Sequence, residues 1–494
     1  MNATGPASSD SEAPGGGTRD RGASDGGAPR AGEFRRPTLA QAPALRVFVA
    51  DAEASWGGSQ ARRDLHRALE RDLGLLAGML GGDSDVVLVP NDGEATSARR
   101  ARLVSSLRQL GLPCATPVSC DRDAYRIDDS AAARAVLQGV SRLAPWAWTQ
   151  PVARLLRPSV GRLGGAPAEE DMQRWVDAGR ALGDKGAVPG LREALGAAGG
   201  ALVQDLAGLL AFWRGAEAAG EAIVCKARHG SSGRDALRLL PGRGEPTTVQ
   251  LGWLRRQLAT HGGVVIERWW PRIADLGRLY LPSPAAEGGL RALPPHQSLC
   301  DARGGFRGVA FGPDAQSAAL AALSPPTDAA WLPRLDAALR ARWADAGFDA
   351  RAEVGVGVDL IVQAGGPQQP APWPVEINAR FTLGHVAAAL SEAVATGASG
   401  RLWLLSAADA RTAGVPLAAL AERLETQWPR TLGSSGLQSG AVALAVGEGA
   451  AMMPMLLIAP SEEALAERWR AIAGADLIAP GLLGTRSDGA EAAL

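Results

Sequence analysis

Two segments of this sequence decide its fold: Val354-Gly355-Val356-Gly357-Val358-Asp359-Leu360 and Pro374-Val375-Glu376-Ile377-Asn378-Ala379-Arg380. Side chains alternate between the two faces of a β-strand, so the first segment places its valines on one face and Gly355, Gly357 and Asp359 on the other. Two positions without a side chain, followed by a carboxylate, predict a face that something approaches closely. A twisted strand with bulge glycines that ends in a solvated aspartate is the alternative for this segment alone.

The second segment carries a continuous polar face, because Glu376, Asn378 and Arg380 alternate with apolar residues. Its connection to the first segment is rich in Gly and Pro, so the two strands can pair antiparallel, roughly 4.8 Å apart. Asp359, Glu376 and Asn378 then converge as hard oxygen ligands suited to Mg²⁺, or to Mn²⁺, bound together with nucleotide phosphates. Arg380 lies beside them, where it can bind a phosphate or a substrate carboxylate. An outward-facing polar strand is the alternative.

Lysine is almost absent from the chain: of 51 lysine and arginine residues, only Lys185 and Lys226 are lysine. GC-rich coding is the simplest cause of this bias, and the two lysines are therefore candidates for positions that need a compact ammonium group. Chance retention is the alternative. Lys226 lies in a predicted strand that leads into a Gly/Ser turn, whose backbone N–H groups can bind phosphate oxygens. No Walker motif is present, and the turn alone is also typical of an ordinary hairpin.

This order of features resembles the ATP-grasp superfamily, which includes biotin carboxylase and D-alanine ligases, over roughly residues 175–390. The resemblance implies a core of two subdomains that clamp ATP between them. It also implies a role for each matching residue: Lys185 and Lys226 as nucleotide-binding lysines, Gly230, Ser231, Ser232 and Gly233 as a mobile loop over the phosphates, Glu267 and Trp269 on the hinge strand beside the adenine, Asp275 at the ribose, Asp359, Glu376 and Asn378 as metal ligands, and Arg380 and Lys226 as catalytic residues.

The rest of the chain predicts an α/β protein with parts on both sides of this core. Residues 1–44 have almost no large apolar side chains and are expected to form a disordered tail. Alternation of strand and helix over residues 45–170 predicts a small open-sheet domain, like those that precede an ATP-grasp core. The two-subdomain core is placed at residues 171–400, and a C-terminal α/β extension at residues 401–494.

Composition excludes several classes of function. The net charge is −1, so there is no basic excess to attract nucleic acid or an anionic membrane. The most apolar run, residues 452–460, is shorter than the roughly 20 residues that a membrane-spanning helix needs. The N-terminus shows no secretory signal. The cysteines, Cys114, Cys120, Cys225 and Cys300, lack the spacing of a zinc site, which indicates a reduced, cytoplasmic compartment.

These expectations combine into a cytoplasmic ligase that uses ATP and Mg²⁺ to activate a small-molecule carboxylate as an acyl phosphate, and then joins it to an amine. An ATP-grasp kinase that phosphorylates a hydroxyl is one alternative, and a non-catalytic ATP-binding module is another. A Ser-His-Asp hydrolase lacks the G-x-S-x-G setting it would need. His229 and His385 remain open as ligand contacts or as structural residues, whereas Trp146 and Trp148 are expected to pack. The substrates and the oligomeric state are left open.

Overall fold

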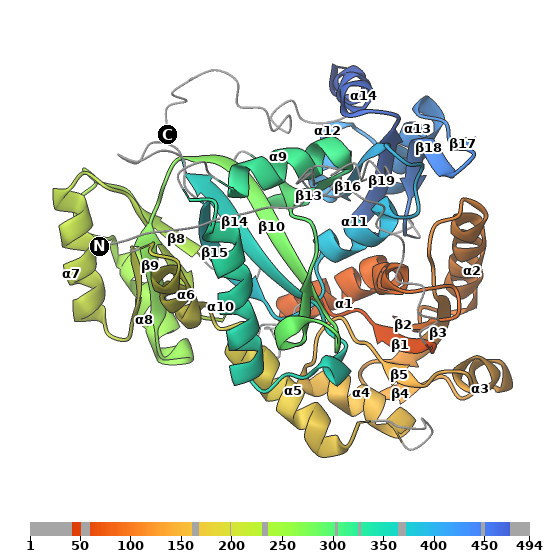
Figure 1. Cartoon of the computed structure of the whole chain (residues 1–494), viewed down its shortest axis with the longest axis horizontal. Coiled ribbons are helices and arrows are strands. Elements are labelled where there is room, and N and C mark those ends of the chain that lie inside the picture. The colour runs from red at the N-terminus through yellow and green to blue at the C-terminus, as the bar shows by residue number, and fades with distance from the viewer. Residues whose placement is uncertain are drawn as a thin grey trace, which may run out of the picture. The chain divides into compact units, whose positions relative to one another are not determined.

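Three β-sheets and the helices packed against them make up the described part of the chain, residues 42–50, 60–160, 167–197, 199–229, 236–301, 305–324, 328–363, 372–445 and 450–474 (Figure 1). The structure is a computed structural model, and all of these residues belong to one unit, Ala40–Leu494. The mixed α/β class predicted from the sequence is confirmed. Residues 1–41, which include nearly all of the expected tail, lie outside the described residues.

The N-terminal sheet is open and mostly parallel, in the order β4-β3-β2-β1-β5. Strands β1, β2, β3 and β5 are parallel, and β4 pairs antiparallel with β3. Buried parallel strands read as continuous apolar runs, which is why Val86-Val87-Leu88-Val89 was recognisable as a strand. The elements are β1 (Ala44–Val47), α1 (Gln60–Leu73), η2 (Gly74–Leu80), β2 (Val86–Pro90), α2 (Glu94–Gln109), β3 (Thr116–Asp121), β4 (Arg126–Ile127), α3 (Ala131–Leu137) and β5 (Arg142–Leu143).

A helical stretch follows, with α4 (Gln150–Val160), α5 (Glu169–Leu182), η3 (Lys185–Ala187) and α6 (Val188–Ala194). The expected packing of Trp146 and Trp148 is confirmed, because both are buried and their rings lie 4.7 Å from Phe48 and 5.1 Å from Trp175, respectively. These indoles therefore stabilise the junction between the open sheet and the helices and are not exposed for ligand stacking.

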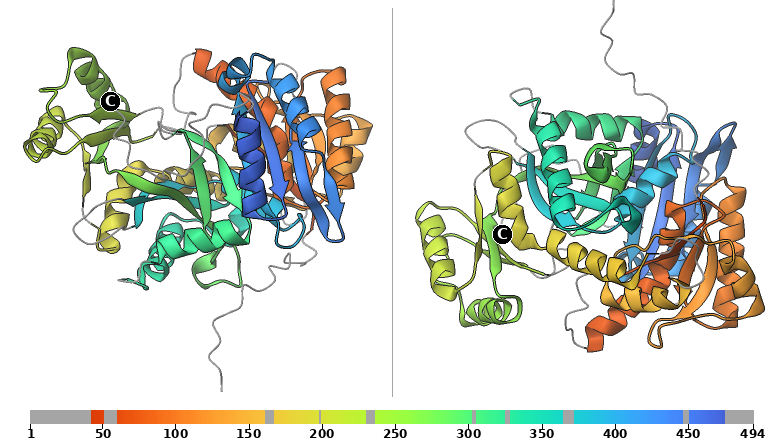
Figure 2. Two further views of the ribbon diagram at one scale, coloured as in Figure 1. Left: turned by 90° about the horizontal axis from the view of Figure 1, so that it is seen from above. Right: turned by 60° about the horizontal axis from the view of Figure 1, so that its bottom comes forward.

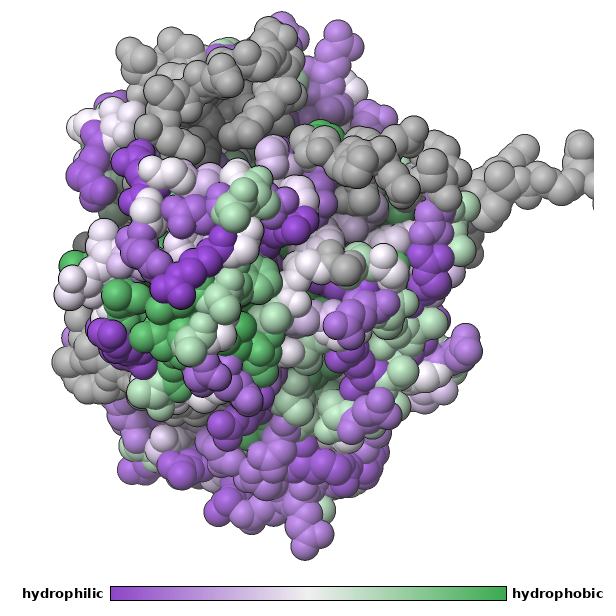
Figure 3. All heavy atoms as spheres, turned by 90° about the vertical axis from the view of Figure 1, so that its left-hand side faces the viewer, coloured by the Kyte–Doolittle hydropathy of each residue, from purple (hydrophilic) through white to green (hydrophobic). Residues whose placement is uncertain are grey.

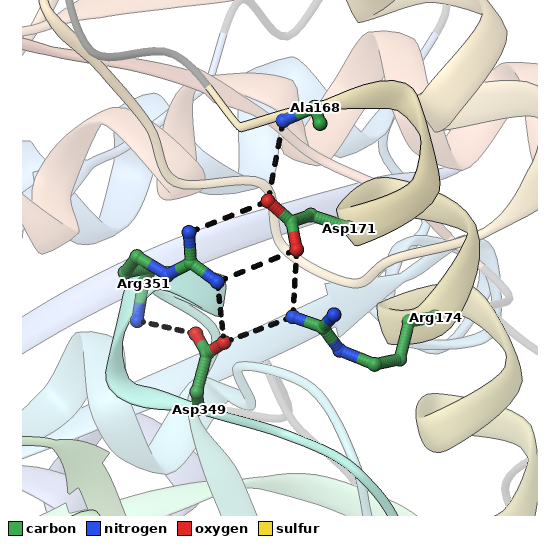
Figure 4. Close-up of polar contacts among 5 residues, drawn as sticks. All are labelled: Ala168, Asp171, Arg174, Asp349 and Arg351. Carbon is green, nitrogen blue, oxygen red and sulfur yellow. Dashed lines mark hydrogen bonds and ion pairs between the residues drawn. The ribbon is translucent and has the colours of Figure 1, made fainter.

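A ring of alternating charges ties α5 to the segment before β14 (Figure 4). The carboxylate of Asp171 lies 2.8 Å from Arg174 and 3.3 Å from Arg351, and Asp349 accepts hydrogen bonds from both arginines at 3.0 and 2.9 Å. Asp171 also accepts the backbone N–H of Ala168, which caps α5. Exposed ion pairs contribute little free energy each, so the ring aligns the two segments more than it stabilises them.

The second sheet is small and antiparallel, in the order β6-β9-β7-β8, with strands β6 (Gly200–Val203), β7 (Ile223–Ala227), β8 (Ala236–Leu239) and β9 (Val264–Arg268). Helices α7 (Leu206–Ala218) and α8 (Thr248–His261) pack on one face of this sheet (Figure 2). Trp213 and Leu254 belong there to one apolar cluster with Ile266. Val249 of α8 is exposed, and Figure 3 shows an apolar patch bordered by polar side chains on the side that α7 and α8 occupy. The opposite face of this sheet carries Lys226 and Glu267.

The third sheet is long, in the order β15-β14-β10-β12-β13-β16-β19-β18-β17, with β11 paired to β10. The sheet includes strands on both sides of residue 400, the limit predicted between the core and the C-terminal extension, because β16 pairs with both β13 and β19. Its strands are β10 (Arg272–Pro282), β11 (Leu290–Ala292), β12 (His296–Cys300), β13 (Phe306–Phe311), β14 (Val356–Gln363), β15 (Pro372–Asn378), β16 (Ser399–Ser406), β17 (Thr431–Gly433), β18 (Gly436–Ala443) and β19 (Met452–Ala459). Its helices are η4 (Glu287–Gly289), α9 (Pro313–Leu323), α10 (Trp331–Asp345), η5 (Ala350–Ala352), α11 (Leu383–Ser391), α12 (Ala407–Thr412), α13 (Leu417–Gln427) and α14 (Glu462–Gly474).

Several elements differ from the sequence-based expectation. Helices α8 and α9 lie between strands of the core and were not predicted from the sequence. The ends of α8 are nevertheless marked in the sequence, by a capping box between Thr247 and Gln250 and by Gly262, which is left-handed at φ 64°. β16 was not predicted because its run Leu402–Leu405 does not alternate, being buried on both faces of the sheet.

Candidate active site

The strands that decide the fold pair as the sequence predicts. β14 and β15 are antiparallel, with Asp359 directly opposite Glu376 and Gly357 opposite Asn378, so the three polar side chains share one face. A register shift follows Asp359 and ends the regular pairing there. The amide Nδ2 of Asn378 donates a hydrogen bond to Asp359 Oδ2 at 3.0 Å. To serve as a metal ligand, this amide would have to turn its oxygen toward the carboxylates.

The two facing carboxylates are short of positive charge. Burial, first, and the charge of Glu376, second, raise the pKa of Asp359 to about 6, against the opposing effects of Asn378, Arg380 and Lys185. Glu376 Oε1 lies 3.2 Å from Lys185 Nζ but makes no hydrogen bond within the described residues. A divalent cation would offset the repulsion between the two carboxylates and would give Glu376 Oε1 a further partner. Asp359, Glu376 and the oxygen of Asn378 therefore fit Mg²⁺.

No group of three or more His, Cys, Asp or Glu side chains in the described ranges forms a metal site. The expected set contains only two carboxylates and one amide. Such a small set is in keeping with Mg²⁺, which is usually held by one or two carboxylates together with water and substrate phosphates.

The glycine face of β14 is approached closely, as the sequence predicts, and the neighbour is the chain itself. A β-carbon at Gly355 would lie 2.7 Å from His385 Nε2, and one at Gly357 would lie 3.0 Å from Thr382 Cγ2. The start of α11 therefore packs against these glycines, and only the part of the face near Asp359 is left for a ligand. The glycines therefore make room for side chains of the protein itself rather than for a substrate.

Lys185 is buried at the start of η3 and is held by its neighbours. Asp184 caps η3 by accepting the N–H of Gly186 at 2.8 Å, and also accepts hydrogen bonds from Arg228 at 2.6 to 2.9 Å. The N–H of Lys185 donates to the carbonyl of Arg228 at 3.3 Å. The segment that carries the first lysine is thus attached to the end of β7, the strand that carries the second. The expected phosphate loop, Gly230, Ser231, Ser232 and Gly233, lies outside the described residues.

Glu267 is engaged by cations inside the protein. Its carboxylate forms ion pairs with Lys226 and with Arg192, and its residue is only 3% exposed. Burial alone would raise its pKa, but Lys226 and Arg192 outweigh that effect, so the pKa of Glu267 is lowered. Both oxygens of the carboxylate are thus engaged inside the protein, and the place of Glu267 beside adenine stays a prediction.

The remaining predicted residues lie near these groups. Trp269 lies under the guanidinium of Arg238, which is 4.0 Å from the ring centroid, and the backbone N–H of Trp269 donates to the carbonyl of Ala222. Asp275, on β10, pairs with Arg272 at 2.8 Å. Arg380 follows β15 and forms no hydrogen bond or ion pair with any described residue, although its charge lowers the pKa of Asp359. An arginine that has no partner among the described residues is suited to bind an anionic substrate group.

Two histidines on this side of the sheet are structural. The N–H of Thr382 donates to His385 Nδ1 at 3.0 Å, so Nε2 carries the proton and donates to the carbonyl of Tyr280 at 3.2 Å. His296 lies opposite Gly277 on β10, and its ring fills the space that side chains at Gly277 and Gly384 would occupy. Burial lowers the pKa of His385 to about 3 and that of His296 to about 4.

His229 adds a third histidine next to the region that carries the lysines. Its ring lies 5.9 Å from that of His261, and burial lowers its pKa to about 4. It is therefore neutral at physiological pH and would contact a phosphate only as a hydrogen-bond donor.

Sequence reasoning missed two residues of this region, Arg192 and His296. Arg192 is one of many arginines in the chain and carries no local signal. His296 could have been found from its partners, because Gly277 and Gly384 both leave room for a ring.

Comparison with known proteins gives matches among solved structures only. No family model matches the chain, and no curated protein does. The chain is similar to N5-carboxyaminoimidazole synthetase from Staphylococcus aureus complexed with ADP, at 10% identity and a TM-score of 0.46, over 88% of this chain and 97% of that one. It is also similar to biotin carboxylase from Campylobacter jejuni in a β-γ-ATP complex, at 12% identity and a TM-score of 0.44, over 90% and 92% of the two chains.

A third similar structure is the N5-carboxyaminoimidazole synthase from Aspergillus clavatus, in complex with ADP and 5-aminoimidazole ribonucleotide. The identity is 12% and the TM-score 0.44, and the match covers 88% of this chain and 99% of that one.

Proposed function

We propose that this chain is an ATP- and Mg²⁺-dependent ligase of the ATP-grasp type, which activates a carboxylate as an acyl phosphate and joins it to an amine. The observation that carries the proposal is the pairing of Asp359 with Glu376, with Lys185 3.2 Å from Glu376 and with Arg380 near enough to act on the charge of Asp359. This arrangement offers ligands for a cation, a cation for phosphate and a binding group for an anionic substrate.

The chain's own residues suit the two steps of such a reaction. Lys226 and Lys185 would bind the phosphates of ATP, and Arg380 would orient the substrate carboxylate toward the γ-phosphorus. A carboxylate oxygen attacks that phosphorus, and the bond to the ADP oxygen breaks. Mg²⁺, or Mn²⁺, held by Asp359, Glu376 and Asn378 would offset the negative charge that develops on the phosphates. An amine then attacks the acyl carbon, loses a proton, and phosphate leaves.

Further properties follow from the same proposal. We propose that the substrates are small molecules and that the enzyme acts in the cytoplasm, where thiols stay reduced. Cys114, Cys120, Cys225 and Cys300 are free thiols, which supports the second point. In the described part of the chain, none of the helices has the length and apolar character needed to cross a membrane. The domain limits proposed from the sequence, residues 45–170, 171–400 and 401–494, are kept as a description of the parts.

The experiment that tests this function measures ATP consumption with Mg²⁺ and pools of carboxylates, each with and without amines. Formation of ADP and phosphate only when both substrate classes are present supports the ligase. ADP formation with an alcohol alone would instead support a kinase. Nucleotide binding without turnover in any pool would support a non-catalytic ATP-binding module.

A further inference from the structure

Arg192 occupies an unusual place for an arginine. Its side chain is 1% exposed, its Nε donates to the carbonyl of Pro374 at 2.8 Å, and its guanidinium lies 4.5 Å from the centre of the Trp373 ring. The Nη2 group pairs with Glu267. A β-carbon at Gly200 would lie 2.7 Å from Nη1, so the glycine leaves room for this group. The guanidinium of Arg192 is therefore enclosed by a carbonyl, a carboxylate, an indole ring and the backbone at Gly200.

The contacts of Arg192 join two sheets. Glu267 lies on β9 of the small sheet, and Pro374 lies on β15 of the long sheet, two residues before Glu376. Arg192 itself belongs to α6, which follows Lys185 directly through η3. One side chain thus links the strand that carries a metal-binding carboxylate to the strand that holds Lys226 in place.

Arg192 also changes the charge available at Lys226. Glu267 presents one carboxylate oxygen to Lys226 and the other to Arg192, so the three side chains together carry one positive charge. Without Arg192, Lys226 and Glu267 would form a neutral pair, and the nucleotide would have to compete with Glu267 for the ammonium group. A net positive charge at this place favours a polyphosphate.

We infer that Arg192 is a positioning residue for the nucleotide site: by sharing Glu267, it leaves the charge of Lys226 available to phosphate and fixes Lys226 relative to β15. The inference rests on the proposed function, because it assumes that Lys226 binds nucleotide phosphate. Only arginine can make this set of contacts, since its planar group offers Nε to a carbonyl, Nη2 to a carboxylate and its face to an indole at once. A lysine could pair with Glu267 but could not reach Pro374 as well.

The test is calorimetric binding of ADP with Mg²⁺ to the full chain and its variants. Arg192→Met is expected to weaken ADP binding about tenfold or more, equivalent to about 1.4 kcal/mol or more. Arg192→Lys is expected to fall between this variant and the wild type, and it keeps the test usable if Arg192→Met does not fold. The double variant Arg192→Met, Glu267→Gln is expected to recover part of the affinity, because Lys226 no longer has a carboxylate competitor, although it is no longer held relative to β15.

The recovery separates positioning from simple stabilisation, since a residue needed only for folding would not be rescued by removing its partner. Arg46→Met is the matched control: Arg46 is also a buried arginine, bonded to Asp85 at 2.6 Å in the N-terminal sheet. It is expected to lose stability but to bind ADP as the wild type does. Wild-type affinity in folded Arg192→Met, or no recovery in the double variant, overturns the inference. Absence of ADP binding by the wild-type chain would instead overturn the proposed function, and the inference with it.

Discussion

The carboxylate of Glu267 and the carboxylates of Asp359 and Glu376 lie in opposite electrostatic settings. Glu267 is one carboxylate with two cations in contact, and its pKa is lowered. Asp359 and Glu376 are two carboxylates with one lysine in contact, and the pKa of Asp359 is raised to about 6. The contacts of the first cluster sum to one positive charge, whereas two carboxylates and Lys185 in the second sum to one negative charge. Under the proposed function, the first cluster would face phosphates and the second a metal ion. A magnesium–nucleotide complex carries the two complementary charges.

The largest effect is expected at the cluster with surplus positive charge. Lys226→Arg keeps the charge, but the wider guanidinium would not fit between Glu267 and the same phosphate oxygens, so ATP turnover should fall about 100-fold or more. Steady-state ADP formation measures this. Arg214→Lys, at an exposed pair with Glu245, is the matched control and should leave the rate unchanged. A nearly normal rate in Lys226→Arg would remove Lys226 from the site.

At the second cluster, Glu376→Gln removes one of the two carboxylates. The fold should remain intact, because Lys185 is the one ion-pair partner of Glu376 among the described residues, but Mg²⁺-dependent turnover should fall on the order of 100-fold. Turnover is measured as a function of Mg²⁺ concentration. Glu462→Gln, which weakens the pair with Arg401 on the far strand β16, should show the wild-type Mg²⁺ dependence. Unchanged dependence in Glu376→Gln would refute the metal site.

The comparison also predicts opposite effects on stability. Glu267→Gln should lower the free energy of unfolding at about pH 7.5 by about 3 kcal/mol, because it leaves Arg192 and Lys226 without their buried partner. Asp359→Asn should raise it by about 1 to 3 kcal/mol, because it removes the repulsion from Glu376. Denaturant unfolding of both variants measures the two values, and the same sign for both would contradict the comparison.

The gain from Asp359→Asn should depend on pH in a defined direction. The pKa of Asp359 is higher in the folded state, about 6, than its ordinary value of 3.8, so the folded state binds the proton more tightly. Through this group, wild-type stability falls as pH rises from about 4 to about 6. The gain in the asparagine variant should therefore be complete above about pH 6 and vanish near about pH 4.

His296 is a second titrating group on the same side of the sheet, and removing it isolates the titration of Asp359. His296 has its pKa lowered from 6.5 to about 4, so the unfolded state binds the proton more tightly and wild-type stability falls as pH falls between these values. His296→Phe should reduce this slope by about 1.4 kcal/mol per pH unit. Denaturant unfolding from about pH 4 to 7 measures the slope, and an unchanged slope would show that His296 does not titrate as its burial indicates.

The strand pattern around Asp359 made much of the site predictable, because alternation determines which side chains share a face before any partner is known. The antiparallel pairing of β14 and β15 and the convergence of Asp359, Glu376 and Asn378 follow from that alternation. A second signal was compositional: lysine is so rare in this chain that Lys185 and Lys226 stood out as candidate site residues. Both signals are local, and the structure brings both sets into ion pairs with carboxylates.

Long-range packing was not predictable in the same way. The role of Arg192 depends on three contacts separated by many residues, with Glu267, Trp373 and Pro374, and no local pattern marks an arginine for burial. The glycines of β14 predicted that something approaches this face closely. They did not identify the neighbour, which is the start of α11, beyond β15 in the chain. β16 was missed because a strand covered on both faces has no alternation to detect.

The central claim is transfer of the γ-phosphoryl group to a carboxylate oxygen. It is tested most directly with the carboxylate substrate labelled with ¹⁸O in its carboxyl group, by mass analysis of the phosphate released during one turnover. The account predicts that one labelled oxygen appears in inorganic phosphate, because the bond between acyl carbon and bridging oxygen breaks when the amine attacks. Label in AMP would show adenylate chemistry, and phosphate without label would show that no acyl phosphate forms; either result would contradict the account.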